Sequence, residues 1–283
     1  MSVLPRLRAA RLGRLVATAA CAVAAACHHV PSGERGGAIR VLVLNMHAGT
    51  DAAGRDNLDR VAALVRETGA DLVLLQEVDS AVARSGRVDQ PAELARRTGF
   101  YARFGNALAY QGGGYGVATL SRWPITDARL VRLPVDPPQE RAGGSHEPRG
   151  VLEVTVAAPG GPLHVLNTHL DPSADDHWRR QEADSVLSLA LTARAGGVLP
   201  VLVGGDFNST PDSEVQARLR AGGLSDLWPT CGEGDGLTYP VEQPVKRIDY
   251  LYALGGMTCE RARVLESDAS DHRGVLFTVW LAR

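Results

Sequence analysis

Short apolar runs that end in polar residues are the feature that most constrains this chain. The clearest is residues 200–208 (PVLVGGDFN), where an apolar run stops at Gly204 and Gly205 and then presents Asp206 and Asn208. This pattern is typical of a strand inside a sheet, with glycines where a ligand or another backbone approaches closely. Four other runs show the same ending, at 41–45, 72–77, 163–169 and 247–249. The sequence therefore predicts a sheet-rich fold that gathers polar side chains at its strand ends.

The first 27 residues have the proportions of an export signal. Four arginines between residues 6 and 14 precede an apolar run of small residues, 15–26, which is too short to span a bilayer comfortably. The run ends at Cys27 in AAAC, which resembles the bacterial lipobox, although Ala24 stands where leucine or valine is usual. We expect an exported protein with a lipidated Cys27 that associates with the membrane of the cell envelope. Simple secretion and a retained N-terminal anchor are the alternatives.

Removing this signal leaves an acidic chain. The count of Lys and Arg falls from 30 to 26 against 32 Asp and Glu, so the net charge changes from -2 to about -6. Nucleic-acid binding relies largely on Lys and Arg that neutralise phosphates, so nucleic acid is not the favoured partner. The only lysine is Lys246, although two arginine pairs, at 96–97 and 179–180, leave room for a local basic patch.

The rest of the chain reads as a tether followed by one domain. Residues 28–37 are short, mostly polar and glycine-containing, as a tether would be, and residues 38–283 form the domain, which we expect to be a monomer. Cys231 and Cys259 fit no metal-binding spacing. They either pair in an oxidising compartment or remain two buried thiols.

Hydrophobic periodicity predicts strands mixed with helices along this domain. Helices are expected at 57–68, 91–98, 174–195 and 213–221, the third with Trp178, Val186, Leu189 and Ala190 on its buried side. Besides the runs already named, strands are expected at 114–120, 249–254, 263–265 and 275–280, with a hairpin formed by 149–156 and 163–170. A long loop is expected at 131–144. No GxGxxG motif follows the first strand, which argues against a dinucleotide-binding fold.

The polar residues at the strand ends are oxygen donors together with two imidazoles. They are Asn45, Glu77, His169, Asp206, Asn208, Asp249, Asp271 and His272. Oxygen-rich sites suit hard cations such as Mg²⁺ or Mn²⁺, whereas zinc sites usually show more His or Cys at short spacing. Because these residues are spread over the whole chain, the fold itself must assemble the site.

Eight sequence motifs, in their order along the chain, resemble those of the endonuclease/exonuclease/phosphatase (DNase I-like) superfamily. They are LNM at 44–46, LQEV at 75–78, GYGV at 114–117 with LSR at 120–122, EPRG at 147–150, NTHL at 167–170, GGDFN at 204–208, RIDY at 247–250 and SDH at 270–272. The resemblance covers residue 39 to the C-terminus. It implies an α/β fold of two β-sheets packed face to face and flanked by helices, a four-layer αββα sandwich.

The resemblance also implies a metal site. By position, Glu77 would be the main Mg²⁺ ligand, with Asn45 beside it and Asp271 at the edge of the metal. Mn²⁺ would serve in the same place.

The remaining roles concern water and phosphate. Asp206 would orient or deprotonate the attacking water, and Asn208 would hold the phosphate. His272 would contact a phosphate oxygen while Asp249 accepts its other N–H. His169 would donate to the developing charge. Metal and imidazoles together can stabilise the transition state of phosphate-ester hydrolysis by in-line attack of water.

The expected function is therefore a Mg²⁺-dependent hydrolase acting on phosphate ester bonds of an envelope or extracellular substrate. A secreted nuclease cleaving DNA or RNA, and a catalytically inactive binding module on the same fold, are the alternatives. Three nearby residues have open roles in the sequence. Arg149 is expected either to orient substrate or to anchor a loop. Tyr115 is expected to pack tightly between glycines, and His47 to lie either at the edge of the site or in a loop.

Overall fold

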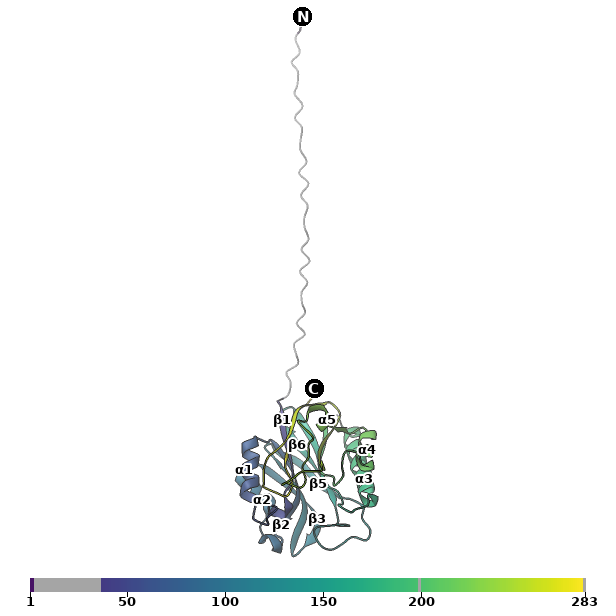
Figure 1. The fold of residues 1–283 in the computed structure, drawn as a ribbon. Helices are drawn as coiled ribbons and strands as arrows, with labels where there is room; N and C mark the ends of the chain where they lie inside the picture. The colour runs from purple at the N-terminus through teal and green to yellow at the C-terminus, as the bar shows by residue number, and fades with distance from the viewer. Residues whose placement is uncertain (3–36, 198–199, 282–283) are drawn as a thin grey trace. The chain divides into compact units, whose positions relative to one another are not determined.

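Two six-stranded β-sheets pack face to face in the computed structural model, which describes residues 1–2, 37–197 and 200–281 (Figure 1). The first sheet has the strand order β11 (Met257–Val264), β12 (Val275–Leu281), β1 (Ile39–Asn45), β2 (Leu72–Ser80), β4 (Gly113–Ser121) and β3 (Tyr101–Tyr110). The second has the order β5 (Ile125–Arg132), β6 (Gly150–Ala158), β7 (Gly161–His169), β8 (Val201–Asp206), β10 (Asp249–Leu254) and β9 (Ser225–Asp226).

Helices cover the outer faces of both sheets. Helices α1 (Leu58–Thr68) and α2 (Gln90–Thr98) lie against the first sheet, and α3 (His177–Ala195) and α4 (Glu214–Ala221) lie against the second (Figure 1). Shorter turns are η1 (His47–Gly49), η2 (Ala83–Ser85) and α5 (Trp228–Cys231). This four-layer arrangement confirms the predicted αββα sandwich.

Alternation along β1 shows how the sequence builds the layers. Val41 and Val43 point into the core between the two sheets, while Leu42 and Leu44 point to the other face and pack under α1. Successive side chains of a strand face opposite ways, so a run that is apolar at every position must be buried on both faces. The continuous apolar runs in the sequence are therefore the central strands of this sandwich.

The sequence pattern does not predict β3, β5 or the two-residue β9. Each lies at the edge of its sheet, and the burial of their residues is mixed, in contrast to the fully buried β8. Edge strands carry polar and charged side chains on their exposed parts, which hides the strand pattern.

The predicted start of the third helix, at residue 174, is wrong. Helix α3 begins at His177, because residues 171–176 instead form a loop held by the buried Arg179, which donates to the carbonyl oxygens of Asp171 and Ser173 at 2.7 and 3.0 Å. Trp178 is only half-buried, against the imidazole rings of His146 and His177. Val186 and Ala190 are buried as predicted.

A disulfide joins Cys231, at the end of α5, to Cys259 in β11. None of the described helices has an apolar stretch long enough to cross a bilayer. Cys27 and nearly all of the predicted signal and tether lie outside the described residues, so these boundaries stay predictions.

Candidate active site

Strand register brings three of the predicted residues side by side. Strands β7 and β8 are parallel, so their C-terminal residues His169 and Asp206 are neighbours. Strand β10 runs antiparallel to β8, and its first residue, Asp249, pairs with Asp206 from the other side. The expectation that the run 247–249 ends a strand is therefore wrong, whereas the expected strand 249–254 is confirmed as β10. Antiparallel pairing places the start of one strand beside the end of its neighbour, so the residue still reaches the site.

Close backbone contact explains Gly205, the glycine directly before Asp206. A Cβ atom on Gly205, whose φ is +144°, would lie 1.9 Å from the carbonyl oxygen of Thr168 on β7. The neighbour that approaches here is another strand and not a ligand. The glycine lets β7 and β8 pair closely enough to bring His169 to Asp206.

A β-bulge turns Glu77 toward the site. The register of β2 against β4 shifts between Leu75 and Val78, and Glu77 takes a left-handed φ of 53°. The bulge interrupts the ladder, and the buried amide of Asn167 donates to the carbonyl oxygens of Leu75 and Ala118 at 3.1 and 2.8 Å. Bulges redirect side chains in this way. Glu77 consequently leaves the alternation of its strand and lines the main cavity.

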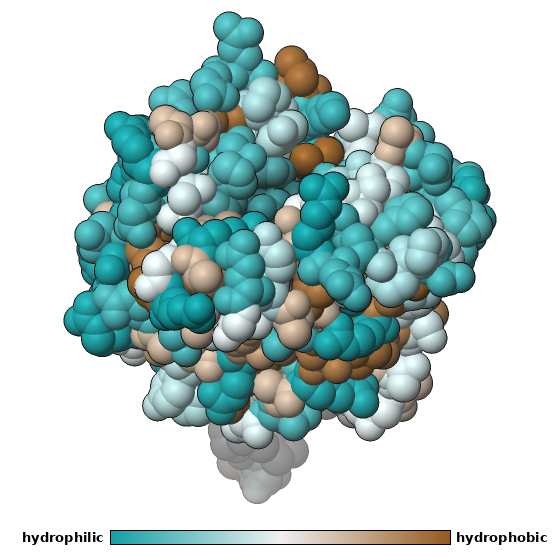
Figure 2. Space-filling model, turned by 90° about the horizontal axis from the view of Figure 1, so that it is seen from below, coloured by the Kyte–Doolittle hydropathy of each residue, from teal (hydrophilic) through white to brown (hydrophobic). Residues whose placement is uncertain are grey.

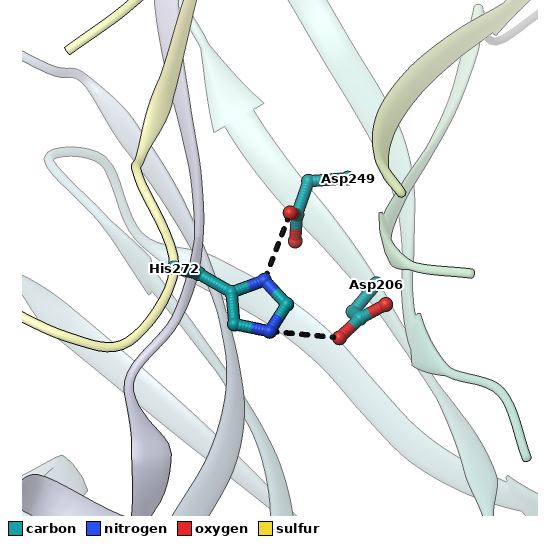
Figure 3. Close-up of side chains that lie close together, drawn as sticks. All are labelled: Asp206, Asp249 and His272. Atoms are coloured by element: carbon teal, nitrogen blue, oxygen red, sulfur yellow. Dashed lines mark hydrogen bonds and ion pairs between the residues drawn. The ribbon is translucent and has the colours of Figure 1, made fainter. Parts of the chain in front are cut away.

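His272 lies between two carboxylates, as Figure 3 shows. Its Nδ1 is 3.0 Å from Oδ2 of Asp249, and its Nε2 is 3.7 Å from Oδ2 of Asp206. All three side chains are buried. The arrangement matches the predicted pair, in which Asp249 accepts the second N–H of the imidazole.

The charges of this triplet influence one another. Burial alone would lower the pKa of His272, but the carboxylate of Asp249 and then that of Asp206 outweigh it and raise the pKa above its usual range. Burial and the negative charge of Asp249 raise the pKa of Asp206, while His272 opposes that rise. The two carboxylates therefore favour the imidazolium form of His272, and the pKa of Asp206 is moved toward the range of a general base.

Oδ2 of Asp206 is the atom on which the predicted residues converge. Nδ2 of Asn45 donates to it at 3.0 Å, and Nε2 of His169 lies at 3.5 Å. The other oxygen, Oδ1, accepts the backbone N–H of Asn208 at 2.9 Å. The carboxylate is thus held from several sides, which fixes its direction.

His169 has a different partner from His272. Its Nδ1 is 2.6 Å from a guanidinium nitrogen of Arg149, and its Nε2 is 3.0 Å from the amide nitrogen of Asn208. Burial, and after it the positive charge of Arg149, hold the pKa of His169 well below its usual range. The sequence left the role of Arg149 undecided. Its guanidinium contacts His169 and lies 3.0 Å from the buried carboxylate of Glu147.

A cavity of about 550 Å³ opens over these residues. Its lining includes six of the predicted site residues: Glu77, His169, Asp206, Asn208, Asp271 and His272. Asp249 lies behind His272, and Asn45 links Glu77 to Asp206 by donating to both at 3.0 Å. All eight predicted residues therefore belong to one contiguous site. Tyr239, whose ring centroid is 4.7 Å from that of His272, also lines the cavity and had no signal in the sequence.

The donor set at Glu77 fits a hard cation. Glu77 and Asp271 are carboxylates on the cavity wall, and no arginine or lysine pairs with either among the described residues. Asn45 turns its amide nitrogen to the carboxylates, while its oxygen accepts from the backbone of His47 at 3.0 Å. Its role as a ligand stays a prediction.

A second group of donors is close enough to hold an ion, namely Asp206, Asp249 and His272. An ion there would displace the hydrogen bond between His272 and Asp249, so we assign the cation to the Glu77 side.

His47 lies at the edge of the site. Its Nδ1 is 3.9 Å from the carboxylate of Asp271, and it lines a neighbouring cavity that shares Glu77 with the main one. His47 and Ala48 both have left-handed φ values, and the buried amide of Gln90 donates to the Ala48 carbonyl at 2.8 Å. Tyr115 is buried as predicted, beside the guanidinium of Arg84.

Comparison with known proteins places this site in a family. Residues 42–272 match the endonuclease/exonuclease/phosphatase family. YbhP of Escherichia coli K12 is 30% identical over 227 residues, which cover 75% of this chain and 83% of YbhP.

Two solved structures show the same fold. The mannosyl-6-phosphatase Bt3783 of Bacteroides thetaiotaomicron superposes with a TM-score of 0.71 at 18% identity, over 85% of this chain and 99% of that one. Sphingomyelinase C of Streptomyces griseocarneus gives a TM-score of 0.64 at 20% identity, over 87% and 100%. Members of the matched family hydrolyse phosphate esters and are typically dependent on a divalent metal. With residues 42–272 matched, this chain belongs to the endonuclease/exonuclease/phosphatase family.

Proposed function

We propose that this protein is an exported, metal-dependent phosphodiesterase that hydrolyses a phosphate ester of the cell envelope, such as a phospholipid head group. The observation that carries the proposal is the carboxylate of Asp206, fixed in direction and surrounded by donors at the base of an open cavity. Such a carboxylate can aim and deprotonate one water molecule while the surrounding donors bind the phosphate.

The chemistry divides among four side chains. Asp206 accepts the proton of the attacking water, and its raised pKa suits that task near neutral pH. His272, charged and oriented by Asp249, donates from Nε2 to a phosphate oxygen. Asn208 and His169, whose nitrogens lie 3.0 Å apart, donate to the charge that develops on the phosphate.

Glu77 and Asp271, with Asn45, would hold the Mg²⁺ or Mn²⁺ ion. When bound, the ion supplies positive charge that stabilises the anionic phosphate in the transition state. The protein's own contribution there is the pair of cavity carboxylates, neither of which pairs with an arginine or lysine among the described residues.

Export is supported by two independent features. The N-terminal residues have the pattern of a lipoprotein signal ending at Cys27. The disulfide between Cys231 and Cys259 is a bond that is rare in reducing compartments and common in secreted proteins. A lipid anchor would hold the domain near membrane lipids and raise their effective concentration at the site.

Charge pairing favours an envelope substrate over DNA. The arginines that the sequence offered as a basic patch are neutralised: Arg96 and Arg97 pair with Glu93, and Arg180 pairs with Glu214. Arg179 pairs with Asp176. A nuclease that grips a duplex needs several cations free to neutralise phosphates.

The face seen in Figure 2 is mostly hydrophilic, with apolar side chains in scattered patches.

Metal dependence is tested with chelator and a single variant. We expect activity to disappear in excess EDTA and to return with Mg²⁺ or Mn²⁺. Glu77→Gln should weaken metal binding and lower the rate, while thermal unfolding stays cooperative. Full turnover in EDTA would exclude this metal-dependent mechanism, and it would exclude the inactive binding module as well.

The substrate class is tested by direct competition of substrates. Purified mature domain should release phosphorylated head groups from phospholipid vesicles with Mg²⁺ at physiological salt, and leave plasmid DNA intact. Rapid cleavage of DNA beside untouched lipid would assign a nuclease instead. Turnover of phosphate monoesters alone would assign a phosphatase. Failure on every phosphate ester would favour the inactive binding module.

Anchoring is tested on the protein from its native membrane fraction. Mass spectrometry should find Cys27 as the lipid-modified N-terminus. An unmodified Cys27, or an N-terminus elsewhere, would contradict the anchor without affecting the assignment of the reaction.

A further inference from the structure

The contact between Arg149 and His169 restricts the protons of the imidazole. The guanidinium of arginine has only N–H donors and no acceptor. Because one of its nitrogens is 2.6 Å from Nδ1 of His169, that ring nitrogen must be the acceptor and cannot carry a proton. A proton on Nδ1 would place two donors against each other. The neutral ring can therefore hold its hydrogen only on Nε2.

Arg149 is itself held in place. Its side chain is 4% exposed and lies 3.0 Å from the carboxylate of Glu147, whose side chain is 1% exposed. The second oxygen of Glu147 accepts the backbone N–H of Gly143, and the Arg149 carbonyl accepts from the backbone of Leu133 at 2.9 Å. Removing a buried charge from such a pair is unfavourable, so the guanidinium keeps both its position and its charge.

We propose that Arg149 is a positioning residue that holds His169 as the neutral tautomer protonated on Nε2. The consequence lies on the cavity side of the ring. Nδ2 of Asn208 already gives one hydrogen to the Leu170 carbonyl at 2.9 Å, and its second hydrogen meets the Nε2–H of His169. Nε2 of His169 lies 3.5 Å from Oδ2 of Asp206, and its N–H, together with the second hydrogen of Asn208, can donate to one oxygen of a bound phosphate.

Three roles for Arg149 predict different results. A substrate contact would place the guanidinium against the ligand, and a loop anchor would act only through Glu147 and Gly143. A positioning role predicts a change in the protons of His169 itself. The inference rests on the proposed function only for the identity of the acceptor. The tautomer follows from the contact alone.

The test is nitrogen NMR of histidine in the folded domain. In protein labelled with ¹⁵N-histidine at neutral pH, His169, assigned by the loss of its signals in His169→Gln, should show an unprotonated Nδ1 and a protonated Nε2. In Arg149→Met, which has no donor at this place, the Nδ1–H tautomer or the imidazolium should become populated. Arg149→Lys, which also only donates, should restore the original tautomer in part.

A matched control separates this effect from the loss of a buried ion pair. Arg247, whose side chain is 6% exposed, pairs with Asp226 at 2.7 Å and makes no hydrogen bond to His169. Arg247→Met should leave the His169 signals unchanged. If Arg149→Met alone does not fold, the double variant Glu147→Gln with Arg149→Met avoids an unpaired carboxylate and makes the same prediction.

Activity gives a second readout. With the phosphate ester that the wild type hydrolyses, Arg149→Met should lower kcat about 10–100-fold, as loss of an orienting partner does. A protonated Nδ1 of His169 in the wild type, or an unchanged tautomer in Arg149→Met, would overturn the inference. If the NMR result is as expected and no phosphate ester is hydrolysed, the proposed function fails and the tautomer assignment stands.

Discussion

His169 and His272 occupy equally buried places around the same carboxylate but have opposite partners. Each is 5% exposed, and each has Nε2 within 4 Å of Oδ2 of Asp206. Nδ1 of His169 meets the guanidinium of Arg149, whereas Nδ1 of His272 meets the carboxylate of Asp249. The pKa of His169 is lowered and that of His272 is raised. Burial lowers the pKa of both imidazoles, so the opposite directions follow from the partner on the far side of each ring.

The largest effect should come from removing the centre that both histidines share. Asp206→Asn and His272→Ala should each lower kcat by on the order of 10²-fold or more, because general base and charged donor act in one step. Their double variant should lose less than the product of the two factors. Steady-state kinetics on the preferred phosphate ester measures all three. Simple multiplication of the losses would show that the two residues act separately.

Neutralising the partner of the charged histidine should have the next largest effect. Asp249→Asn keeps the shape of the side chain but removes the charge that holds His272 as an imidazolium. We expect kcat to fall about 10–100-fold, with KM changed little. A kcat equal to that of the wild type would mean that His272 does not need the carboxylate of Asp249 for catalysis. The different partners of His169 and His272 would then have no effect on the rate.

The His169 side also contains a buried acid, Glu182, that makes no ion pair with either histidine. Glu182 accepts the backbone N–H of Asp171 at 2.7 Å, and burial raises its pKa to about 8 from an ordinary 4.5. Between these two values the folded state keeps a proton that the unfolded chain has lost. The free energy of unfolding should therefore fall as the pH rises from about 4.5 to 8.

Glu182→Gln should remove this pH dependence. Because one pKa unit corresponds to about 1.4 kcal/mol, the variant should gain stability relative to the wild type by a few kcal/mol across the window. Urea unfolding at pH 5 and pH 8 measures it, with the exposed Glu67→Gln as the control. Parallel stability curves for wild type and Glu182→Gln would show that Glu182 is ionised in the folded protein.

The smallest effect should come from the aromatic neighbour that only His272 has. The ring of Tyr239 tilts against His272 with centroids 4.7 Å apart, and no aromatic ring contacts His169 among the described residues. Tyr239→Leu should lower kcat only a few-fold, because Asp249 still orients the imidazole. Tyr239→Phe, which keeps the ring, should behave like the wild type. An effect as large as that of Asp249→Asn would mean that packing, and not the carboxylate, places His272.

The sequence predicts which residues form the site better than it predicts how they are oriented and which residues they contact. Apolar runs that end in Asn45, His169 and Asp206 identify those residues, because strand ends meet at a sheet edge. The direction of Glu77 depends on a bulge, which a run of alternating or apolar residues does not encode. Asp249 is the first residue of β10 and reaches the site because β10 pairs antiparallel with β8. No local sequence pattern states the direction of a partner strand.

The role of Arg149 shows the same limit. A residue type and a motif leave a substrate contact and a loop anchor equally open. The deciding observation is the distance to Nδ1 of His169, between residues 20 positions apart, one just before β6 and the other at the end of the neighbouring β7. Edge strands β3 and β5 are missed for a different reason, because buried, partly buried and exposed positions are mixed along them and give no regular period.

The close packing at Gly205 predicts which substitutions the protein tolerates at this position. Any side chain at this position would collide with the Thr168 carbonyl, since even a Cβ atom would lie 1.9 Å from it. Strands β7 and β8 would have to separate, and His169 would leave Asp206. In a saturation mutagenesis screen for activity, position 205 should consequently be as intolerant as Asp206, although glycine has no group that can take part in the reaction. Genetic sensitivity at this site therefore reports strand spacing as well as chemistry.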